Sequence, residues 1–282
     1  MSIKEKLESL GRNSIQLKIA GKETHKLGAT RFGGKPDVPP DFVWPTYEGE
    51  SYDHVVKDRP LTFLAQFNCA ELAQFDKEHL LPDHGLLSFF YETDTQCWGY
   101  DPKDQGCARV YWFEDMSALS AADFPADMGE DFKFPMVKIK LDAKTSYPSW
   151  QDFSEMFPDE KDDDAFNDAL DELTGEDPEN PDDRSQLLGW PDVIQNSMFA
   201  ECELVNQGYY LGNGWVKIPK EVRQRAEETA RDRWMLLFQL DIVEYGDFEL
   251  MFGNCGHIYF YITKEDLAAR RFDRIWLVLQ CY

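Results

Sequence analysis

Leu61-Thr-Phe-Leu-Ala-Gln-Phe-Asn68 is an apolar run with glutamine in the sixth place and asparagine at its end. A second run, Trp234-Met-Leu-Leu-Phe-Gln-Leu-Asp241, has glutamine in the same place and ends on aspartate. Short apolar runs rich in aromatic residues are typical of buried β-strands. The match between the two runs predicts that one strand-containing unit occurs twice in the chain.

Other features recur around the two runs in the same order. Each run is followed by a glycine with aromatic residues and then by a last apolar strand, and each is preceded by a Gly-x-Pro-Asp-Val motif; the paired segments are 85–91 and 256–262, 110–113 and 275–278, and 34–38 and 189–193. The sequence therefore predicts an α+β, β-rich fold of two related repeats of mostly antiparallel strands with short flanking helices. The alternative is that these patterns arose independently.

The repeats divide the chain into three parts. We expect an N-terminal lobe over residues 1–150, an acidic connector over 151–184 and a C-terminal lobe over 185–282, with the two lobes packed as one globular unit. Alternating apolar and polar residues predict a half-buried strand over 15–19, and a further strand is expected over 136–141. Both of these strands are assigned to the N-terminal lobe.

The connector carries most of the negative charge. Residues 152–183 hold 15 acidic residues and one basic residue, Lys161, for a net −14 within the chain's −24. Phe166, Leu170 and Leu173 share a helical face, which predicts a helix over 164–173 that ends at Gly175. Residues 176–183 have the composition of a mobile linker, and like-charge repulsion is expected to hold the connector extended. It is either a spacer or a docking surface for a basic partner.

Composition disfavours several classes of protein. The first residues lead into a charged helix pattern and not a signal peptide, and no apolar run approaches the roughly 20 residues of a membrane-spanning helix. The six cysteines form no C-x-x-C pair and are expected to be reduced, so we predict a cytoplasmic protein. A net charge of −24 disfavours nucleic acid and anionic membranes as partners. A basic protein is the natural electrostatic partner, although acidity can serve solubility alone.

Several motifs together carry a family resemblance. They are Phe32-Gly-Gly-Lys-Pro-Asp-Val-Pro, Phe42-Val-Trp-Pro, Leu64-Ala-Gln-Phe-Asn, Leu188-Gly-Trp-Pro-Asp and the closing Ile275-Trp-Leu-Val-Leu-Gln-Cys-Tyr. From about residue 29 to the end, the chain resembles the YwqG-like family of bacterial proteins, a domain of unknown function. The resemblance implies a mostly β, two-repeat architecture without established catalytic residues. It also implies, through members near secreted-toxin genes, a toxin-neutralising role. The acidic connector has no place on the family pattern.

No motif predicts catalysis, a cofactor or a metal site. The chain lacks G-x-S-x-G, H-E-x-x-H, P-loop and G-x-G-x-x-G patterns. An EF-hand loop starting at Asp162 would need glycine and glutamate where Asn167 and Leu173 stand. Cys255 and His257 could share one face of a strand, but Gly256 between them interrupts it. We therefore assign no catalytic, cofactor-binding or metal-ligating residue.

The candidate binding residues are polar side chains in apolar or acidic surroundings. Gln66 and Gln239 lie inside apolar strands, where an unpaired amide would cost roughly 1–3 kcal/mol. They either bond the backbone of a neighbouring loop, such as the Gly-Pro segment of their own repeat, or line a cleft between the lobes with Asn68 and Asp241. Asn68 and Asp241 are otherwise helix or turn caps. The connector adds the candidates Asp162, Asp163 and Asp164.

The function that these observations favour is binding without catalysis. We predict a cytoplasmic protein that sequesters another protein, with a basic toxin or nuclease as the partner. The alternative is a small-molecule-binding protein or an unrecognised hydrolase with a site between the two repeats, and a third reading is a structural or adaptor protein. The sequence leaves the oligomeric state open.

Overall fold

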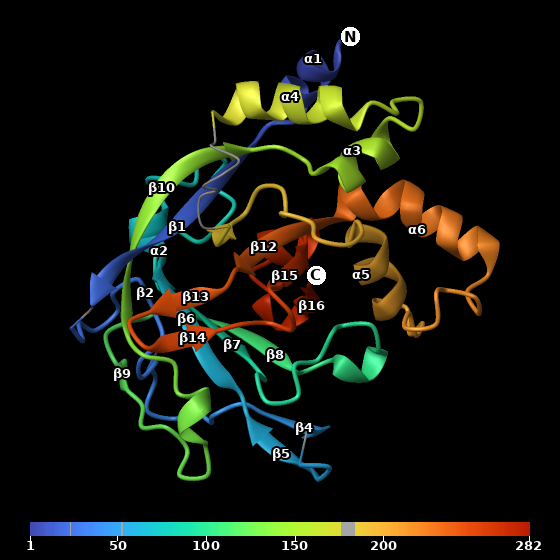
Figure 1. Cartoon of the computed structure of the whole chain (residues 1–282). Coiled ribbons are helices and arrows are strands. Elements are labelled where there is room, and N and C mark those ends of the chain that lie inside the picture. Colours follow the sequence, from blue (N-terminus) through green and yellow to red (C-terminus); the bar gives the residue numbers. More distant parts are fainter. Residues whose placement is uncertain (23, 52, 176–183) are drawn as a thin grey trace.

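The fold is built on one strongly curved sheet of ten strands (Figure 1). The computed structural model describes residues 1–22, 24–51, 53–175 and 184–282. Every strand pairing in it is antiparallel, which confirms the predicted α+β, β-rich class. In sheet order the strands are β16 (Trp276–Gln280), β15 (His257–Thr263), β12 (Trp234–Leu240), β11 (Gln186–Leu187), β1 (Arg12–Lys22), β10 (Val137–Ser146), β2 (Arg31–Phe32), β6 (Thr62–Asn68), β7 (Leu86–Tyr91) and β8 (Ala108–Phe113).

The two longest strands, β1 and β10, form the middle of the sheet. Their register runs from Arg12 opposite Ser146 to Lys22 opposite Val137, with one bulge between Ile19 and Gly21. On its other edge β1 pairs with β11, and β10 pairs with β2. Both predicted strands, 15–19 and 136–141, are therefore present. They are longer than expected, and they lie at the centre of the sheet between its two flanks.

The flanks on either side of this centre have the same order of elements. One runs β2-β6-β7-β8 and the other β11-β12-β15-β16. Each long inner strand carries a register shift at the matching place, between Phe63 and Ala65 in β6 and between Leu236 and Phe238 in β12. These similarities support the predicted duplication, which remains a prediction, as do the lobe boundaries.

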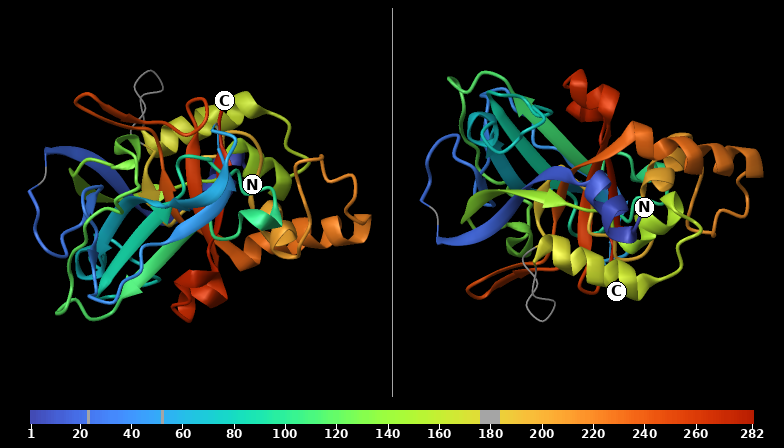
Figure 2. Two further views of the ribbon diagram at one scale, coloured as in Figure 1. Left: turned by 90° about the horizontal axis from the view of Figure 1, so that it is seen from below. Right: turned by 90° about the horizontal axis from the view of Figure 1, so that it is seen from above.

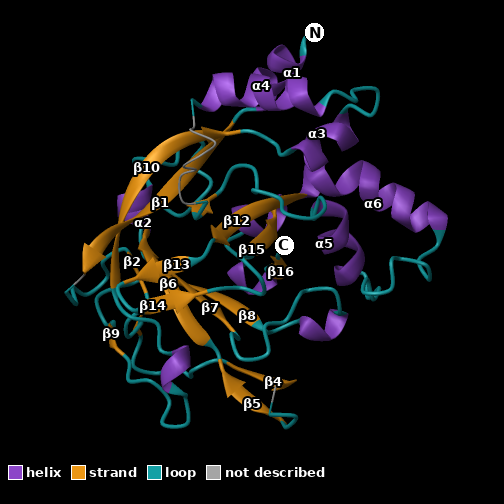
Figure 3. Cartoon of the chain, in the orientation of Figure 1, coloured by secondary structure: helices purple, strands orange, loops and turns teal. Residues whose placement is uncertain are grey.

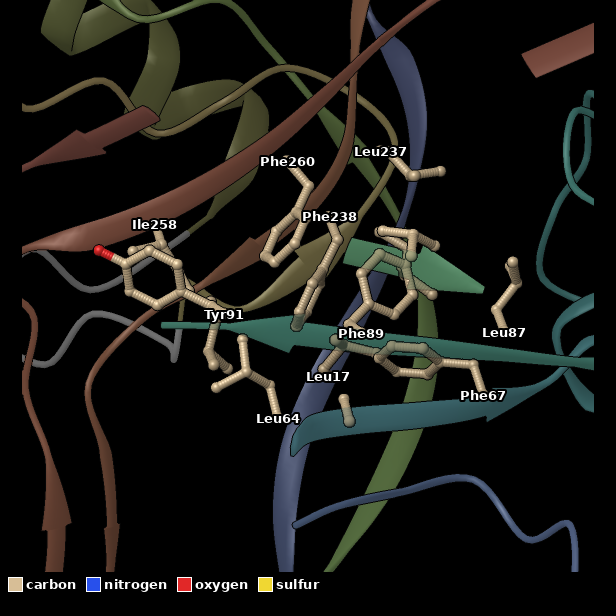
Figure 4. Close-up of a cluster of buried hydrophobic side chains, with 14 of the residues drawn as sticks. Leu17, Leu64, Phe67, Leu87, Phe89, Tyr91, Leu237, Phe238, Ile258 and Phe260 are labelled. Carbon is tan, nitrogen blue, oxygen red and sulfur yellow. The ribbon is translucent and has the colours of Figure 1, made fainter. Parts of the chain in front are cut away.

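The concave side of the sheet holds an aromatic core to which both flanks contribute (Figure 4). Phe89 lies 4.8 Å from Phe238 and 5.3 Å from Phe260, and Phe67 lies 5.5 Å from Phe238, all between ring centroids. Edge-to-face and tilted aromatic pairs of this kind are worth about 0.5–1.5 kcal/mol each beyond the burial of their area. The two flanks are thus held together by side-chain packing as well as by the central strands.

The remaining strands form small two-stranded sheets beside the main one. They are β3 (Asp37–Val38) with β9 (Ser120–Ala121), β4 (Thr46–Glu50) with β5 (Val56–Pro60), and β13 (Val243–Tyr245) with β14 (Phe248–Leu250). Two short helices follow inner strands, α2 (Cys69–Leu72) and α7 (Lys264–Ala268). Single 3-10 turns occur at Pro102–Asp104, Glu130–Phe132 and Phe272–Arg274.

The longer helices lie on one side of the sheet (Figure 3). They are α1 (Ile3–Leu10), α3 (Trp150–Met156), α4 (Asp163–Thr174), α5 (Phe199–Asn206) and α6 (Lys220–Arg233). Helices α5 and α6 pack against β12 and share a second apolar cluster that includes Trp190 and Tyr261. Among the described residues, no helix has both the length and the apolar character needed to cross a membrane.

The acidic connector is largely folded, which corrects the expectation that its charges hold it extended. Helix α4 confirms the predicted helix over 164–173, and Gly175 ends it with a left-handed φ of 64°. Its apolar face packs against α1 and α3, where Phe166 lies 5.0 Å from Phe153 and 5.3 Å from Trp150. The ribbon of α4 runs beside that of α1 (Figure 2). Burial of this face outweighs the repulsion between solvated charges on the other face. The predicted linker over 176–183 lies outside the described residues.

Replacing Phe166 tests whether the connector belongs to the fold. Phe166→Ala should lower the free energy of unfolding by about 3 kcal/mol, because it leaves a cavity between α4, α1 and α3. Urea denaturation of both proteins measures the difference. The neighbouring Asn167 is exposed, so Asn167→Ala serves as the control and should change the free energy of unfolding little. Equal stability of wild type and Phe166→Ala would show that α4 is only a spacer.

Candidate functional site

The first predicted site residue, Gln66, is fully buried and bonded to its own repeat. Its Oε1 accepts a hydrogen bond from the backbone N–H of Asp37 at 3.0 Å. Its Nε2 donates to the carbonyl of Ala29 at 3.0 Å and to Asp37 Oδ2 at 2.7 Å. The Asp37 carboxylate also holds the buried guanidinium of Arg31 at 3.1 Å. Gln66 therefore anchors the Gly-x-Pro-Asp-Val loop to strand β6.

Gln239 makes the corresponding bonds in the other flank. Its Oε1 accepts from the N–H of Asp192 at 2.9 Å, and its Nε2 donates to the carbonyl of Arg184 at 2.8 Å. Both glutamines thus bond the backbone of a neighbouring loop, as the first of the two interpretations predicted. Each is fully buried, so a ligand would reach it only after these loops moved. Their binding role stays a prediction.

Asn68 and Asp241, the partners predicted for a cleft, act as caps. Asn68 Oδ1 accepts from the N–H of Ala70 at 3.1 Å at the start of α2, and its Nδ2 donates to the carbonyl of Gly28 at 2.9 Å. Asp241 accepts from the N–H groups of Ile242 and Arg184, at 2.6 and 3.2 Å. The simpler reading of both residues is the one that the geometry supports.

Asp241 also takes part in a buried charge cluster around His257. The imidazole lies between two carboxylates, with Nδ1 3.0 Å from Asp241 and Nε2 3.4 Å from Asp192. Burial lowers the pKa of His257, but the two carboxylates outweigh it and raise the pKa to about 9. The ring is therefore charged at neutral pH and both nitrogens face acids, which argues against the base role that a Cys255–His257 pair would require.

The connector candidates begin helix α4. Asp162 is its N-cap and accepts from the N–H of Ala165 at 2.9 Å, while Asp163 and Asp164 lie exposed in the first turn. Negative charges there interact favourably with the helix dipole. These three side chains face solvent at a helix terminus, away from the two buried glutamines. Among the described residues, the predicted candidates do not come together in one cavity.

A cavity of about 570 Å³ lies instead between α3, α5 and α6. We call it the carboxylate pocket and define it by Glu155 on α3, Ser197 before α5, Glu201 on α5, Trp215 in the turn before α6, and Glu227 and Arg231 on α6. Its volume is in the range of pockets that hold small molecules or single side chains. Three of its six defining residues are acidic.

Glu201 is the unusual member of the carboxylate pocket. The residue is only 7% exposed, and its Oε2 has no hydrogen-bond partner among the described residues. Burial, and then the charge of Glu155, raise the pKa of Glu201 to about 8. A buried carboxyl without a partner costs stability, so its presence calls for a functional explanation.

A second unpartnered carboxyl lies behind the pocket, on α3. Asp152 is fully buried, and neither of its oxygens nor the hydroxyl of Ser197 makes a hydrogen bond of good geometry to a described residue. Burial raises the pKa of Asp152 to about 6, although Ser197 and the charge of Arg231 are close enough to lower it. The buried hydroxyl of Tyr261 is equally without a partner in the described chain. Unmet acceptors therefore concentrate in this region.

The rim of the carboxylate pocket combines charge with an aromatic ring. Arg231 Nη2 lies 2.5 Å from Glu155 Oε2, which places one cation beside the acids. Trp215 is half-buried and has a left-handed φ of 65°, a conformation that bulky residues rarely adopt. Within the described chain, no three His, Cys, Asp or Glu side chains are arranged to hold a metal ion. The pocket thus combines three carboxyl groups, one guanidinium and one indole ring.

The sequence analysis missed this pocket because its residues are spread over 155–231 and follow no motif. One signal was present: Glu201 and Glu203 stand inside Phe199-Ala-Glu-Cys-Glu-Leu-Val, an otherwise apolar helix. Glu203 is explained by its bonds to Arg233 at 2.7 Å and to the indole of Trp234 at 2.8 Å. Glu201 has no such explanation, and the contrast between the two singles it out.

The fold and the pocket together define a β-rich α+β domain with an acidic, solvent-open cavity on its helical side. The family described as "Domain of unknown function (DUF1963)" matches residues 30–281, and the chain belongs to that family. No curated protein matches the chain significantly.

Replacing Gln66 tests its role as an anchor. Gln66→Leu should lower the free energy of unfolding by at least ~2 kcal/mol, because it leaves the Asp37 N–H and the Ala29 carbonyl without these hydrogen bonds in the interior. Thermal or urea unfolding measures the loss, and Gln74→Leu on the exposed side of the helix-end turn serves as the control. A fully stable Gln66→Leu protein would show that these bonds are dispensable.

Proposed function

We propose that this protein is a non-enzymatic binding protein that captures a basic protein on its acidic helices. The observation that carries the proposal is that the acidic residues of the connector stand on a folded platform. We call this platform the acidic helical surface and define it by its exposed acids, Glu155, Asp159, Asp162, Asp163, Asp164, Asp168, Asp171 and Glu172.

Few of these charges are neutralised within the chain. Glu172 pairs with Lys4 at 2.5 Å, and Glu155 pairs with Arg231 at 2.5 Å. Among the described residues, no ion pair forms with Asp159, Asp163, Asp164, Asp168 or Asp171. A surface of this sign raises the rate at which a basic partner arrives, since charge acts on diffusional encounter.

Folding of the connector strengthens the proposal. The acids of α4 are fixed in space because Phe166 and its neighbours anchor the helix to α1 and α3. A partner that binds a preformed surface does not have to supply the cost of ordering it. The acidic helical surface is therefore better suited to specific docking than a mobile acidic tail of the same charge.

Three finer assignments belong to the same proposal. We place the chain in the YwqG-like group on the motifs quoted above, and we assign it a toxin-neutralising, immunity-type role against a basic toxin or nuclease. We also propose a cytoplasmic location, which the six free thiols support. Its oligomeric state is left open.

Charge neutralisation tests the docking surface. Asp163→Asn, Asp164→Asn and Asp168→Asn together should slow association with the partner by about tenfold, because they weaken electrostatic steering. The partner is first recovered from native lysate with the full chain and identified, and its rates are then measured at two salt concentrations. Association of the wild type should fall as salt rises beyond the level where the screening length is ~8 Å.

A matched triple on another element controls for net charge. Glu244→Gln, Asp247→Asn and Glu249→Gln remove the same number of exposed charges from the β13–β14 hairpin and should leave the association rate nearly unchanged. The melting temperatures of both triples should stay within a few degrees of the wild type. Equal rates for the two triples, or recovery of no basic protein, would contradict the proposal.

A further inference from the structure

We infer that the carboxylate pocket binds one alkylammonium group, with Glu201 as its charge partner. The group is either the side chain of a lysine or a free primary amine. The inference deepens the proposed function by naming the chemical group recognised, and it rests on that function only where the lysine belongs to a docked protein. Glu155 on helix α3 belongs both to the carboxylate pocket and to the acidic helical surface, so the pocket opens at the edge of that surface.

The unmet acceptors of the region match the donors of an ammonium ion. Glu201 Oε2 is buried without a partner among the described residues. The Ser197 hydroxyl lies near the Asp152 and Glu155 carboxylates, to which it can donate, and its oxygen keeps a lone pair that can accept; Glu201 and Ser197 both line the cavity. An alkylammonium group carries three N–H donors that can point to separate acceptors. A ligand that satisfies these acceptors removes the cost of leaving a buried polar group unpaired.

The arrangement favours ammonium over guanidinium. A guanidinium binds best to two parallel oxygens of one carboxylate, in a fork geometry. The buried Glu201 Oε2 and the Ser197 hydroxyl come from different residues, and Arg231 already occupies Glu155. A compact ion with three rotatable donors fits such scattered acceptors better than a rigid plane.

The apolar part of the pocket suits the carbon chain of the ligand. Trp215, Ala200 and Gly214 line the same cavity as the acids. An alkyl chain buried against them is removed from water, and an ammonium over the indole face gains a further cation–π attraction. The pocket therefore offers carboxyl groups to the charged head of the ligand and an apolar wall to its carbon chain.

Binding of the ligand should release a proton from Glu201 to the solvent. The titratable groups around Glu201 are Glu155 from α3, Glu227 and Arg231 from α6, Tyr100 from the segment between β7 and β8, and Tyr261 from β15, with Asp152 behind the pocket beside Tyr261. Burial raises the pKa of Glu201 to about 8, so the empty pocket holds it protonated at neutral pH, whereas an ammonium ligand needs the carboxylate. Affinity should therefore rise from pH 6 to 8 and level off above that, while the amine stays charged.

The experiment uses n-butylammonium chloride as the probe, with n-butanol as the uncharged probe of similar shape. Calorimetry or NMR titration of the full chain should show that n-butylammonium binds and n-butanol does not, with proton uptake by the buffer at pH 7. Glu201→Gln should weaken binding roughly 10- to 100-fold, the value of a charged hydrogen bond. Glu228→Gln, one residue beyond the pocket on α6, is the matched control and should bind as the wild type does.

Two further measurements distinguish a lysine side chain from a free amine as the ligand, and loss of pocket binding from loss of protein docking. Lysine blocked at both backbone ends should bind as n-butylammonium does if the pocket takes the lysine side chains of proteins. It should not bind if the pocket takes only small amines that lack a peptide backbone. The triple change of Asp163, Asp164 and Asp168 should leave n-butylammonium binding intact, so loss of protein docking and loss of pocket binding are distinguishable. Melting curves confirm that Glu201→Gln is folded. Absence of n-butylammonium binding to the wild type, or equal binding by Glu201→Gln, would overturn the inference.

Discussion

The pairing of β1 with β10 forms the centre of the sheet and positions both flanks and the helices around it. It is the longest register in the sheet, from Arg12 opposite Ser146 to Lys22 opposite Val137, and it joins the two flanks along their inner edges. The flanks also meet through the aromatic core and through a backbone hydrogen bond from the N–H of Leu279 to the carbonyl of Trp98 at 3.1 Å. The pairing is antiparallel, so the start of β1 and the end of β10 lie at the same end of the sheet. Helix α1 precedes β1 and helix α3 follows β10, and the two helices are therefore brought together.

This one constraint also explains where the acidic connector and the carboxylate pocket lie. Helix α3 leaves the centre of the sheet and meets α5 and α6, which pack on the flank formed by β12, β15 and β16. Arg12, the first residue of β1, stacks 3.7 Å from the ring of Trp190, and the Trp190 indole donates to the carbonyl of Leu10 at 2.7 Å. These contacts fix the end of the ladder against the second flank and hold the walls of the pocket in place.

Local features of the fold could be predicted from the sequence, and non-local ones could not. The strands around Gln66 and Gln239, the helix of Phe166 and its stop at Gly175 follow from periodicity and from residue conformational preference. The central place of β1 and β10 left no local sign, because pairing partners are chosen by contacts between distant segments. Glu201 was overlooked for the same reason. Its role depends on neighbours on α3 and α6 that the sequence does not show to be near.

Native-state hydrogen exchange can test whether the β1–β10 ladder holds the molecule together, since it reports the free energy of opening at each amide. If the β1–β10 ladder joins the molecule, its amides should exchange only through global unfolding and be the most protected in the protein. The amides of β6–β7 and β12–β15 should then approach the same limit together. Contradiction would come from β1 and β10 amides that exchange faster than those of both flanks, because each flank would then be stable without the ladder.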